Sequence, residues 1–319
     1  MKSNPKQFAI IGSGSIGIGW AIVFARAGNQ VKVYDIDQSR LDYFNQGLIE
    51  RLGALVDEEL LDEAAVSVSA RITTTLDLAE AVGVAEYIQE CAPENLETKK
   101  LIFASLIELS TPKAIIASST SALKSSSFTA DLLTRERCLV VHPGNPPYLL
   151  SVVEVVPAPF TSVEVVARTQ EIMRELHMSP ILVKQEIEGF VFNRLQGAML
   201  REAYALVNDG VIEPKDIDIV VTQGLAKRWS IIGPFGTSAL NVEGGITAHA
   251  ERMGESYYRM GAERGQGERW SKELIVKVAL GIEKIFHNED WVKNVNKRDR
   301  ALMKLTRLMK GNDLFNFYR

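Results

Sequence analysis

The chain has 319 residues, with 36 lysines and arginines against 40 aspartates and glutamates, which gives a formal net charge of −4. This balance offers no excess of positive charge for nucleic acid or an anionic membrane, so small-molecule partners are expected. The two cysteines, Cys91 and Cys138, are too few for a disulfide framework, which is typical of a cytoplasmic protein. At roughly 150 residues per domain, the length predicts two domains.

One apolar segment raises the question of a membrane. Residues 8–25 are uncharged and approach the length of a spanning helix, but Gly12, Gly14, Gly17 and Gly19 lie within them. Glycines at this density disfavour a lipid-facing helix, and no cleavage pattern of a signal peptide follows. We therefore expect a soluble protein without a targeting segment.

Short β-branched runs alternate with helical patterns in the first part of the chain, which is typical of βαβ units with a mainly parallel sheet. The predicted strands cover residues 6–11, 30–34, 71–74, 86–90, 113–117, 137–141, 152–156 and 180–183. The predicted helices cover residues 16–27, 39–55, 93–109 and 162–176. Gly28 closes the first helix, Ser39 is the expected N-cap of the second, and Pro93 opens the third.

Long helical periodicities replace this pattern after residue 188. They cover residues 190–208, 214–224, 238–264, 270–286 and 297–310, with hardly a strand-like run among them. The sequence therefore predicts an α/β domain over 1–188 and an all-α domain over 189–319, joined without a flexible linker.

A glycine-rich motif links the first predicted strand to the first helix. Gly12 permits a tight turn, Gly14 lets a pyrophosphate approach the backbone, and Gly17 lets helix and strand pack closely. The backbone N–H groups of Ser15 and Ile16, at the positive end of the helix, would face the phosphates. This pattern in this context predicts a Rossmann-type domain that binds a dinucleotide.

Asp35 ends the second predicted strand, 23 positions after Gly12. A carboxylate at this place accepts hydrogen bonds from the adenosine ribose hydroxyls and repels a 2′-phosphate. NAD is therefore the expected cofactor, in preference to NADP.

Four polar residues lie where strands or helices end near the predicted carboxyl edge of the sheet, where open α/β sheets bind ligands. His142 leaves an apolar strand, and Glu154 lies within the apolar run Val-Val-Glu-Val-Val, where a carboxylate needs a partner. A histidine held by a carboxylate is a suitable general base for alcohol oxidation. Ser121 and Asn193 could then donate hydrogen bonds to the reacting oxygen. Singly, each of the four also fits an ordinary cap, turn or surface position.

Six segments give the chain a resemblance to the 3-hydroxyacyl-CoA dehydrogenase superfamily, most closely its lambda-crystallin or L-gulonate 3-dehydrogenase branch. They are Gly-Ser-Gly-Ser-Ile-Gly at 12–17, Gln-Glu-Cys-Ala-Pro-Glu-Asn-Leu at 89–96, Ser-Ser-Thr-Ser at 118–121, His-Pro-Gly-Asn-Pro-Pro-Tyr at 142–148, Val-Glu-Val-Val at 153–156 and Gly-Phe-Val-Phe-Asn-Arg-Leu at 189–195. In combination they are specific, and they span most of the chain.

The resemblance implies roles for individual residues. It places the catalytic histidine on His142 and the orienting glutamate on Glu154, with substrate contacts at Ser121 and Asn193. It also implies that two residues of the third helix, Glu94 and Lys99, contact NAD, although the pattern alone indicates exposed positions for both. The family further implies a homodimer formed through the helical domain.

The substrate is the least defined part of the prediction. Arg228, followed by Trp229, resembles the arginine and aromatic pair of the members that act on small acids, and a guanidinium suits a carboxylate. We therefore expect oxidation of the 3-hydroxyl of a small hydroxy acid, L-gulonate to 3-dehydro-L-gulonate. Gly144 and Gly236 depart from the family's pattern and leave open a bulkier substrate, 3-hydroxybutyryl-CoA or carnitine.

Other functional classes fit less well. A non-enzymatic, crystallin-like structural protein would have no need for all four polar residues at the sheet edge. The four histidines, of which only His142 lies near the predicted site, are scattered along the chain, so no metal site is expected.

Overall fold

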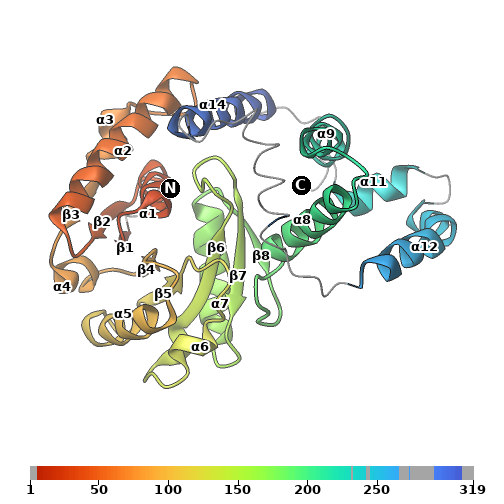
Figure 1. The fold of residues 1–319 in the computed structure, drawn as a ribbon. Helices are drawn as coiled ribbons and strands as arrows, with labels where there is room; N and C mark the ends of the chain where they lie inside the picture. Colours follow the sequence, from red (N-terminus) through yellow and green to blue (C-terminus); the bar gives the residue numbers. More distant parts are fainter. Residues whose placement is uncertain (1–5, 231–232, 242–244, 266–272, 274–290, 311–319) are drawn as a thin grey trace. The chain divides into compact units, whose positions relative to one another are not determined.

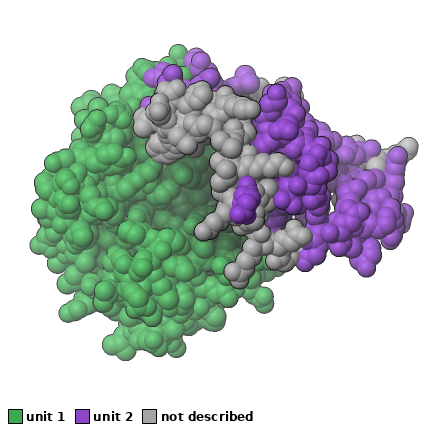
Figure 2. All heavy atoms as spheres, viewed as in Figure 1, with its two compact units in different colours: residues 1–195 green, residues 196–319 purple. Residues whose placement is uncertain are grey.

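A computed structural model describes residues 6–230, 233–241, 245–265, 273 and 291–310. The chain divides into two compact units, Met1–Leu195 and Gln196–Arg319, which Figure 2 colours separately. The boundary falls within helix α8 (Phe192–Asn208), so one helix continues from the first unit into the second.

The first unit is built on one eight-stranded sheet (Figure 1). Its strands are β1 Gln7–Ile11, β2 Gln30–Tyr34, β3 Ile72–Thr75, β4 Tyr87–Glu90, β5 Ile115–Ser118, β6 Cys138–Pro143, β7 Val152–Pro157 and β8 Ser179–Leu182. All eight predicted strands are present, with ends that differ by no more than two residues. The mainly parallel α/β prediction is therefore confirmed.

The strand order is β3-β2-β1-β4-β5-β6-β7-β8, and every pair is parallel except β6 with β7. The chain proceeds outward from β1 to β2 and β3, then returns to the other side of β1 with β4. In a doubly wound sheet, ligands bind outside the carboxyl ends of the strands at such a reversal. Register aligns Ile11 with Glu90 and Glu90 with Ser118, so the strands end together at this place.

Several α-helices accompany the sheet in the first unit. They are α1 Ser15–Arg26, α2 Gln38–Asp57, α3 Ala65–Ser69, α4 Leu78–Val82, α5 Leu96–Leu109, α6 Ser126–Thr129 and α7 Val163–Glu175. The predicted N-cap at Ser39 is wrong, because Asp37 caps α2 by accepting from the N–H of Ser39. Likewise α5 begins after Asn95, which accepts from the N–H of Thr98, and not at Pro93.

Helix α1 is deeply buried beside the strand reversal, since nine of its residues are buried. Its Trp20 and Phe24 are fully buried, and Phe24 packs edge-on against Phe8 of β1 with ring centroids 4.9 Å apart. Burial of each side chain of this size stabilises the fold by about 1.5–3 kcal/mol. The N-terminus of α1 is thereby held firmly at the end of β1.

The second unit is helical throughout the residues that the structure describes. Its elements after α8 are α9 Pro214–Val220, a π-helical turn Val221–Leu225, α10 Ala226–Trp229, α11 Pro234–Asn241, α12 Gly245–Arg264 and α14 Trp291–Met309. The predicted helix 238–264 is thus divided between α11 and α12, and the predicted helix 270–286 lies outside the described residues. Among the described helices, none combines the length and apolar character needed to cross a bilayer.

Candidate active site

The glycine loop between β1 and α1 has two glycines that the surrounding backbone requires. Gly12 has φ of +105°, and a Cβ there would lie 2.7 Å from the carbonyl oxygen of Cys91. A Cβ on Gly17 would lie 2.1 Å from the oxygen of Gly12. A Cβ on Gly14 would meet no atom within 4 Å. The space beside Gly14, at the start of α1, is therefore left open where a dinucleotide phosphate would fit.

Asp35 follows β2 and is bound to the same loop. Its Oδ2 accepts hydrogen bonds from the backbone N–H of Ser13 at 2.9 Å and from the Ser13 hydroxyl at 2.7 Å. The carboxylate has two consequences: it fixes the loop, and it presents negative charge where a ribose is expected. The sequence indicated the second role and missed the first.

We expect substitution of Asp35 to change the choice of cofactor. Asp35→Ala removes the repulsion of a 2′-phosphate and the hydrogen bonds to Ser13, whereas Asp35→Asn keeps an acceptor for Ser13. Both variants should raise the ratio of kcat/KM for NADP to that for NAD at least about tenfold, the value of one hydrogen bond to a charged group. Steady-state kinetics with the two cofactors measures this ratio. An unaltered ratio in both variants would mean that the ribose is recognised elsewhere.

His142 and Glu154 face each other directly across the antiparallel pair of β6 and β7. Nδ1 of His142 lies 2.8 Å from Oε2 of Glu154, and both side chains are buried. The other carboxylate oxygen, Oε1, accepts from the backbone N–H groups of Val191 at 2.7 Å and Phe192 at 3.0 Å. The glutamate thus holds the imidazole with one oxygen and the start of α8 with the other.

The charge on Glu154 determines which ring nitrogen of His142 carries the proton. Burial alone would raise the pKa of Glu154, but hydrogen bonds from His142, Phe192 and Val191 outweigh it and lower the pKa below its ordinary value. The ionised carboxylate can only accept, so Nδ1 of His142 is the donor. In the neutral imidazole, Nε2 then carries the lone pair and can accept a proton.

Aromatic side chains pack around the imidazole. The ring centroid of Phe190 lies 5.5 Å from that of His142, and the Phe192 centroid lies at 6.1 Å. Phe190 is fully buried and has a positive φ of 49°, a conformation that a bulky residue adopts only when its surroundings enforce it. The segment 189–195 contains Phe190, but the sequence indicated no role for it at the site.

The structure also brings together Ser121 and Asn193, which are 72 positions apart in the chain. Nδ2 of Asn193 donates to the backbone oxygen of Ser121 at 2.8 Å. Because Asn193 directly follows the two residues whose N–H groups bind Glu154, this pair and the His142 pair are joined through one short segment. All four predicted catalytic residues therefore lie in the first unit and belong to one connected set of contacts.

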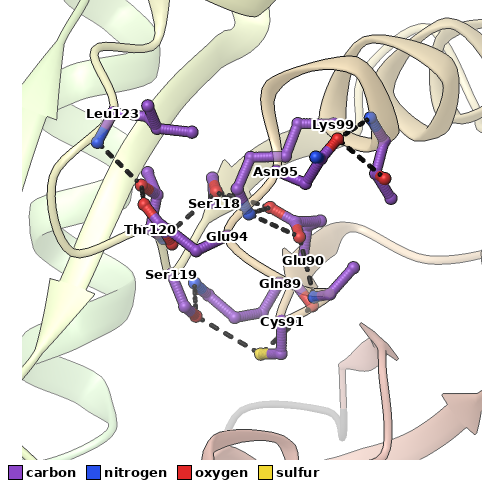
Figure 3. A network of polar contacts seen from close by, with 12 residues as sticks. Gln89, Glu90, Cys91, Glu94, Asn95, Lys99, Ser118, Ser119, Thr120 and Leu123 are labelled. Carbon is purple, nitrogen blue, oxygen red and sulfur yellow. Dashed lines mark hydrogen bonds and ion pairs between the residues drawn. The ribbon is translucent and has the colours of Figure 1, made fainter.

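The last residue of β5 and the loop after it are held by side chains from other parts of the unit (Figure 3). The hydroxyl of Ser118 donates to Glu90, and that of Thr120 donates to Glu94. Ser119 accepts from the indole N–H of Trp20 at 3.0 Å and from the amide of Gln89 at 2.7 Å. These contacts fix the loop up to Ser121, the residue expected to reach the substrate.

Lys99 is buried, so the exposed position that the helical pattern indicated for it is wrong. It is 1% exposed, and its Nζ lies 2.9 Å from each carboxylate oxygen of Glu90. Glu94 is exposed and accepts from Thr120. The ammonium of Lys99 is thus already paired within the protein, and its contact with NAD stays a prediction.

Cys91 lies beside this network and is not a candidate nucleophile. Its Sγ is 3.3 Å from Oγ of Ser119 (Figure 3). Burial raises the pKa of the Cys91 thiol to about 12, so the thiol stays protonated at neutral pH.

Three positions bear on the substrate. At Gly144 an added Cβ would lie 2.9 Å from Cβ of Leu150 and 3.1 Å from Cγ1 of Val152. Leu150 and Val152 therefore fill the space that a side chain at position 144 would occupy, so Gly144 opens no additional space on that side. Arg228 lies on α10 in the second unit with an exposed side chain, and Gly236 lies on α11.

Comparison with known proteins assigns the family. Residues 7–187 match the model for the 3-hydroxyacyl-CoA dehydrogenase NAD binding domain, and residues 189–274 match that for its C-terminal domain. The chain belongs to the 3-hydroxyacyl-CoA dehydrogenase family. It is an NAD-dependent oxidoreductase that acts on a CH–OH group, as the sequence predicted.

Proteins with different names are similar to the chain over nearly its full length. A lambda-crystallin homolog of Homo sapiens is 36% identical, covering 94% of this chain and 95% of the relative. An L-carnitine dehydrogenase of Bacillus cereus is 33% identical, covering 97% and 94%. Among solved structures, an NAD+-dependent 5-formyl-3-hydroxy-2-methylpyridine 4-carboxylic acid 5-dehydrogenase has a TM-score of 0.84 at 27% identity, covering 97% and 99%.

Proposed function

We propose that the protein oxidises the 3-hydroxyl of a small hydroxy acid, L-gulonate, to give 3-dehydro-L-gulonate. The observation that carries this proposal is the buried pair of His142 and Glu154, with Nε2 of the histidine left as a base. Support for a small acid comes from the similarity to lambda-crystallin homologs and from the filled space beside Gly144.

The residues would divide the reaction as follows. Nε2 of His142 takes the proton of the 3-hydroxyl, and Glu154 stabilises the resulting imidazolium. Asn193 has a second N–H beyond the one bound to Ser121, and this N–H donates to the substrate oxygen as it becomes a carbonyl. Bound NAD would supply the hydride acceptor for the carbon that bears the 3-hydroxyl.

The test is NADH formation by purified protein with NAD at alkaline pH, comparing L-gulonate, L-carnitine, L-3-hydroxybutyrate and 3-hydroxybutyryl-CoA. Turnover of L-gulonate in preference to the CoA ester is the expected result. Preference for 3-hydroxybutyryl-CoA or for carnitine, the two alternatives, would overturn the proposed substrate and leave the proposed roles of His142 and Glu154 unchanged. Failure with all four substrates by protein that binds NADH would favour a non-enzymatic, crystallin-like role.

Arg228 is the proposed cation for the substrate carboxylate. We expect Arg228→Met to raise KM for L-gulonate about tenfold or more, because it removes a charge-assisted hydrogen bond, with little change in kcat. Lys227→Met is the matched control, since Lys227 is the preceding residue of α10 and is also exposed. Equal KM values for the two variants would exclude Arg228 from the site.

We also propose that the protein is a cytoplasmic homodimer. Both cysteines are unpaired thiols, as in a reducing compartment. The second unit exposes large apolar side chains, including Phe235, Tyr258 and Leu308, of the kind that a subunit interface covers. Sedimentation equilibrium tests the dimer, and a monomer at micromolar concentration would contradict it.

A further inference from the structure

Arg51 places a positive charge on the first residue of α1. Its Nη1 lies 2.8 Å from the backbone oxygen of Ser15, and its Nη2 lies 2.7 Å from Oγ of the same serine. Ser15 follows Gly14 directly and begins the helix whose N-terminus is expected to face the dinucleotide. Neither the proposed reaction nor the predicted cofactor contacts involve this arginine.

The reach of Arg51 follows from the close approach of two helices. On α2, Gly47 lies one turn before Arg51 and so shares its face. A Cβ on Gly47 would lie 2.9 Å from Cδ1 of Ile18 on α1, so the two helices pack closely at this position. The guanidinium also lies over the ring of Tyr148, at 5.8 Å from its centroid, which orients it from a third element.

The charge of Arg51 is not neutralised by an acidic side chain within the part of the chain that the structure describes. Its contacts there are the two oxygens of Ser15 and the aromatic face of Tyr148. A guanidinium has five N–H donors, so donors remain for another group. Because Oγ of Ser15 accepts from Arg51, the serine's own proton is free to be donated outward.

A dinucleotide brings two negative charges to this place. The helix end offers about half an elementary charge, and α1 has no acidic residue in its first turn. Lys99, the one cation among the predicted cofactor contacts, is paired with Glu90. We infer that Arg51 binds the diphosphate of the dinucleotide, directly and through the polarised hydroxyl of Ser15.

Ligand affinity tests this role without any substrate. NADH binding is followed by its fluorescence, and ADP and adenosine are titrated as competitors against wild-type and Arg51→Met protein. We expect Arg51→Met to weaken NADH and ADP about tenfold to a hundredfold, as for a hydrogen bond between charged groups, and to leave adenosine unchanged. The difference should shrink as salt is added, since the interaction is between partly exposed charges.

Two further variants give the experiment its controls. Arg51→Lys keeps the charge but loses the planar fork, so its affinity for ADP should lie between wild type and Arg51→Met. Arg174→Met, at an exposed arginine of α7, should bind all three ligands like wild type. Equal weakening of ADP and adenosine in Arg51→Met, or unchanged affinity for NADH, would show that Arg51 only supports the fold. Either result would overturn the inference while leaving the cofactor and the proposed substrate unaffected.

Discussion

His142→Gln should reduce turnover by about a hundredfold or more, the usual contribution of a general base. Glutamine can still donate to Glu154 from its amide, so the contact between β6 and β7 is kept. It has no group that accepts a proton at neutral pH in place of Nε2. Steady-state kcat for the best substrate measures the loss, and NADH affinity should stay at the wild-type value because the glycine loop is unchanged.

Glu154→Gln leaves His142 in place and changes the group that orients its ring. Its carbonyl oxygen can still accept from the N–H groups of Val191 and Phe192, while its amide nitrogen would face Nδ1 of His142. A donor at that place favours the other tautomer, which puts the proton on Nε2 and removes the base. Turnover should therefore fall in this variant too, with the thermal stability kept. Wild-type turnover in both variants would exclude the pair from catalysis.

Lys99→Met should destabilise the first unit by about 3–5 kcal/mol, because it leaves the carboxylate of Glu90 buried without its counter-charge. The side chains of both residues are at most 1% exposed, and Nζ contacts both carboxylate oxygens. For a unit of this size the thermal midpoint should fall by roughly 10 °C. Differential scanning calorimetry measures the shift.

The neighbouring lysine is the matched control. Lys100 pairs with Glu97 on the surface of the same helix, with side chains 45% and 75% exposed. Lys100→Met should change stability by no more than about 0.5 kcal/mol. The double variant Glu90→Gln with Lys99→Met removes both charges and should recover much of the lost stability. Equal midpoints for the two single variants would contradict the assignment of a buried ion pair.

The positions of the strands and of the main polar residues could be predicted because they depend on local pattern. The glycine motif was recognisable from its spacing and from its place between a predicted strand and a predicted helix. A carboxylate in the apolar run around Glu154 could be buried only with a partner. The structure provides that partner in His142. A histidine at the end of one apolar run and a carboxylate within another therefore indicated the catalytic pair before any geometry was known.

The burial of Lys99 and the contact of Arg51 depend on tertiary packing. The buried residues of α5 are Lys99, Phe103 and Leu106, so the lysine occupies the first place of the apolar stripe. That spacing was a visible signal, but without the partner Glu90 on β4 a lysine there is expected to be exposed. Arg51 gave no signal, because its contact with Ser15 depends on the close packing of α2 against α1.

The pairing of β6 with β7 also determines where the chain can tolerate changes in length. His142 and Glu154 are opposite each other in the ladder, so inserting one residue within either strand would turn one of them to the opposite face of the sheet. Residues 144–151 lie between the strands, outside that ladder. A change of length in this connection leaves His142 opposite Glu154, so the proton-transfer pair tolerates there a change that it would not tolerate within either strand.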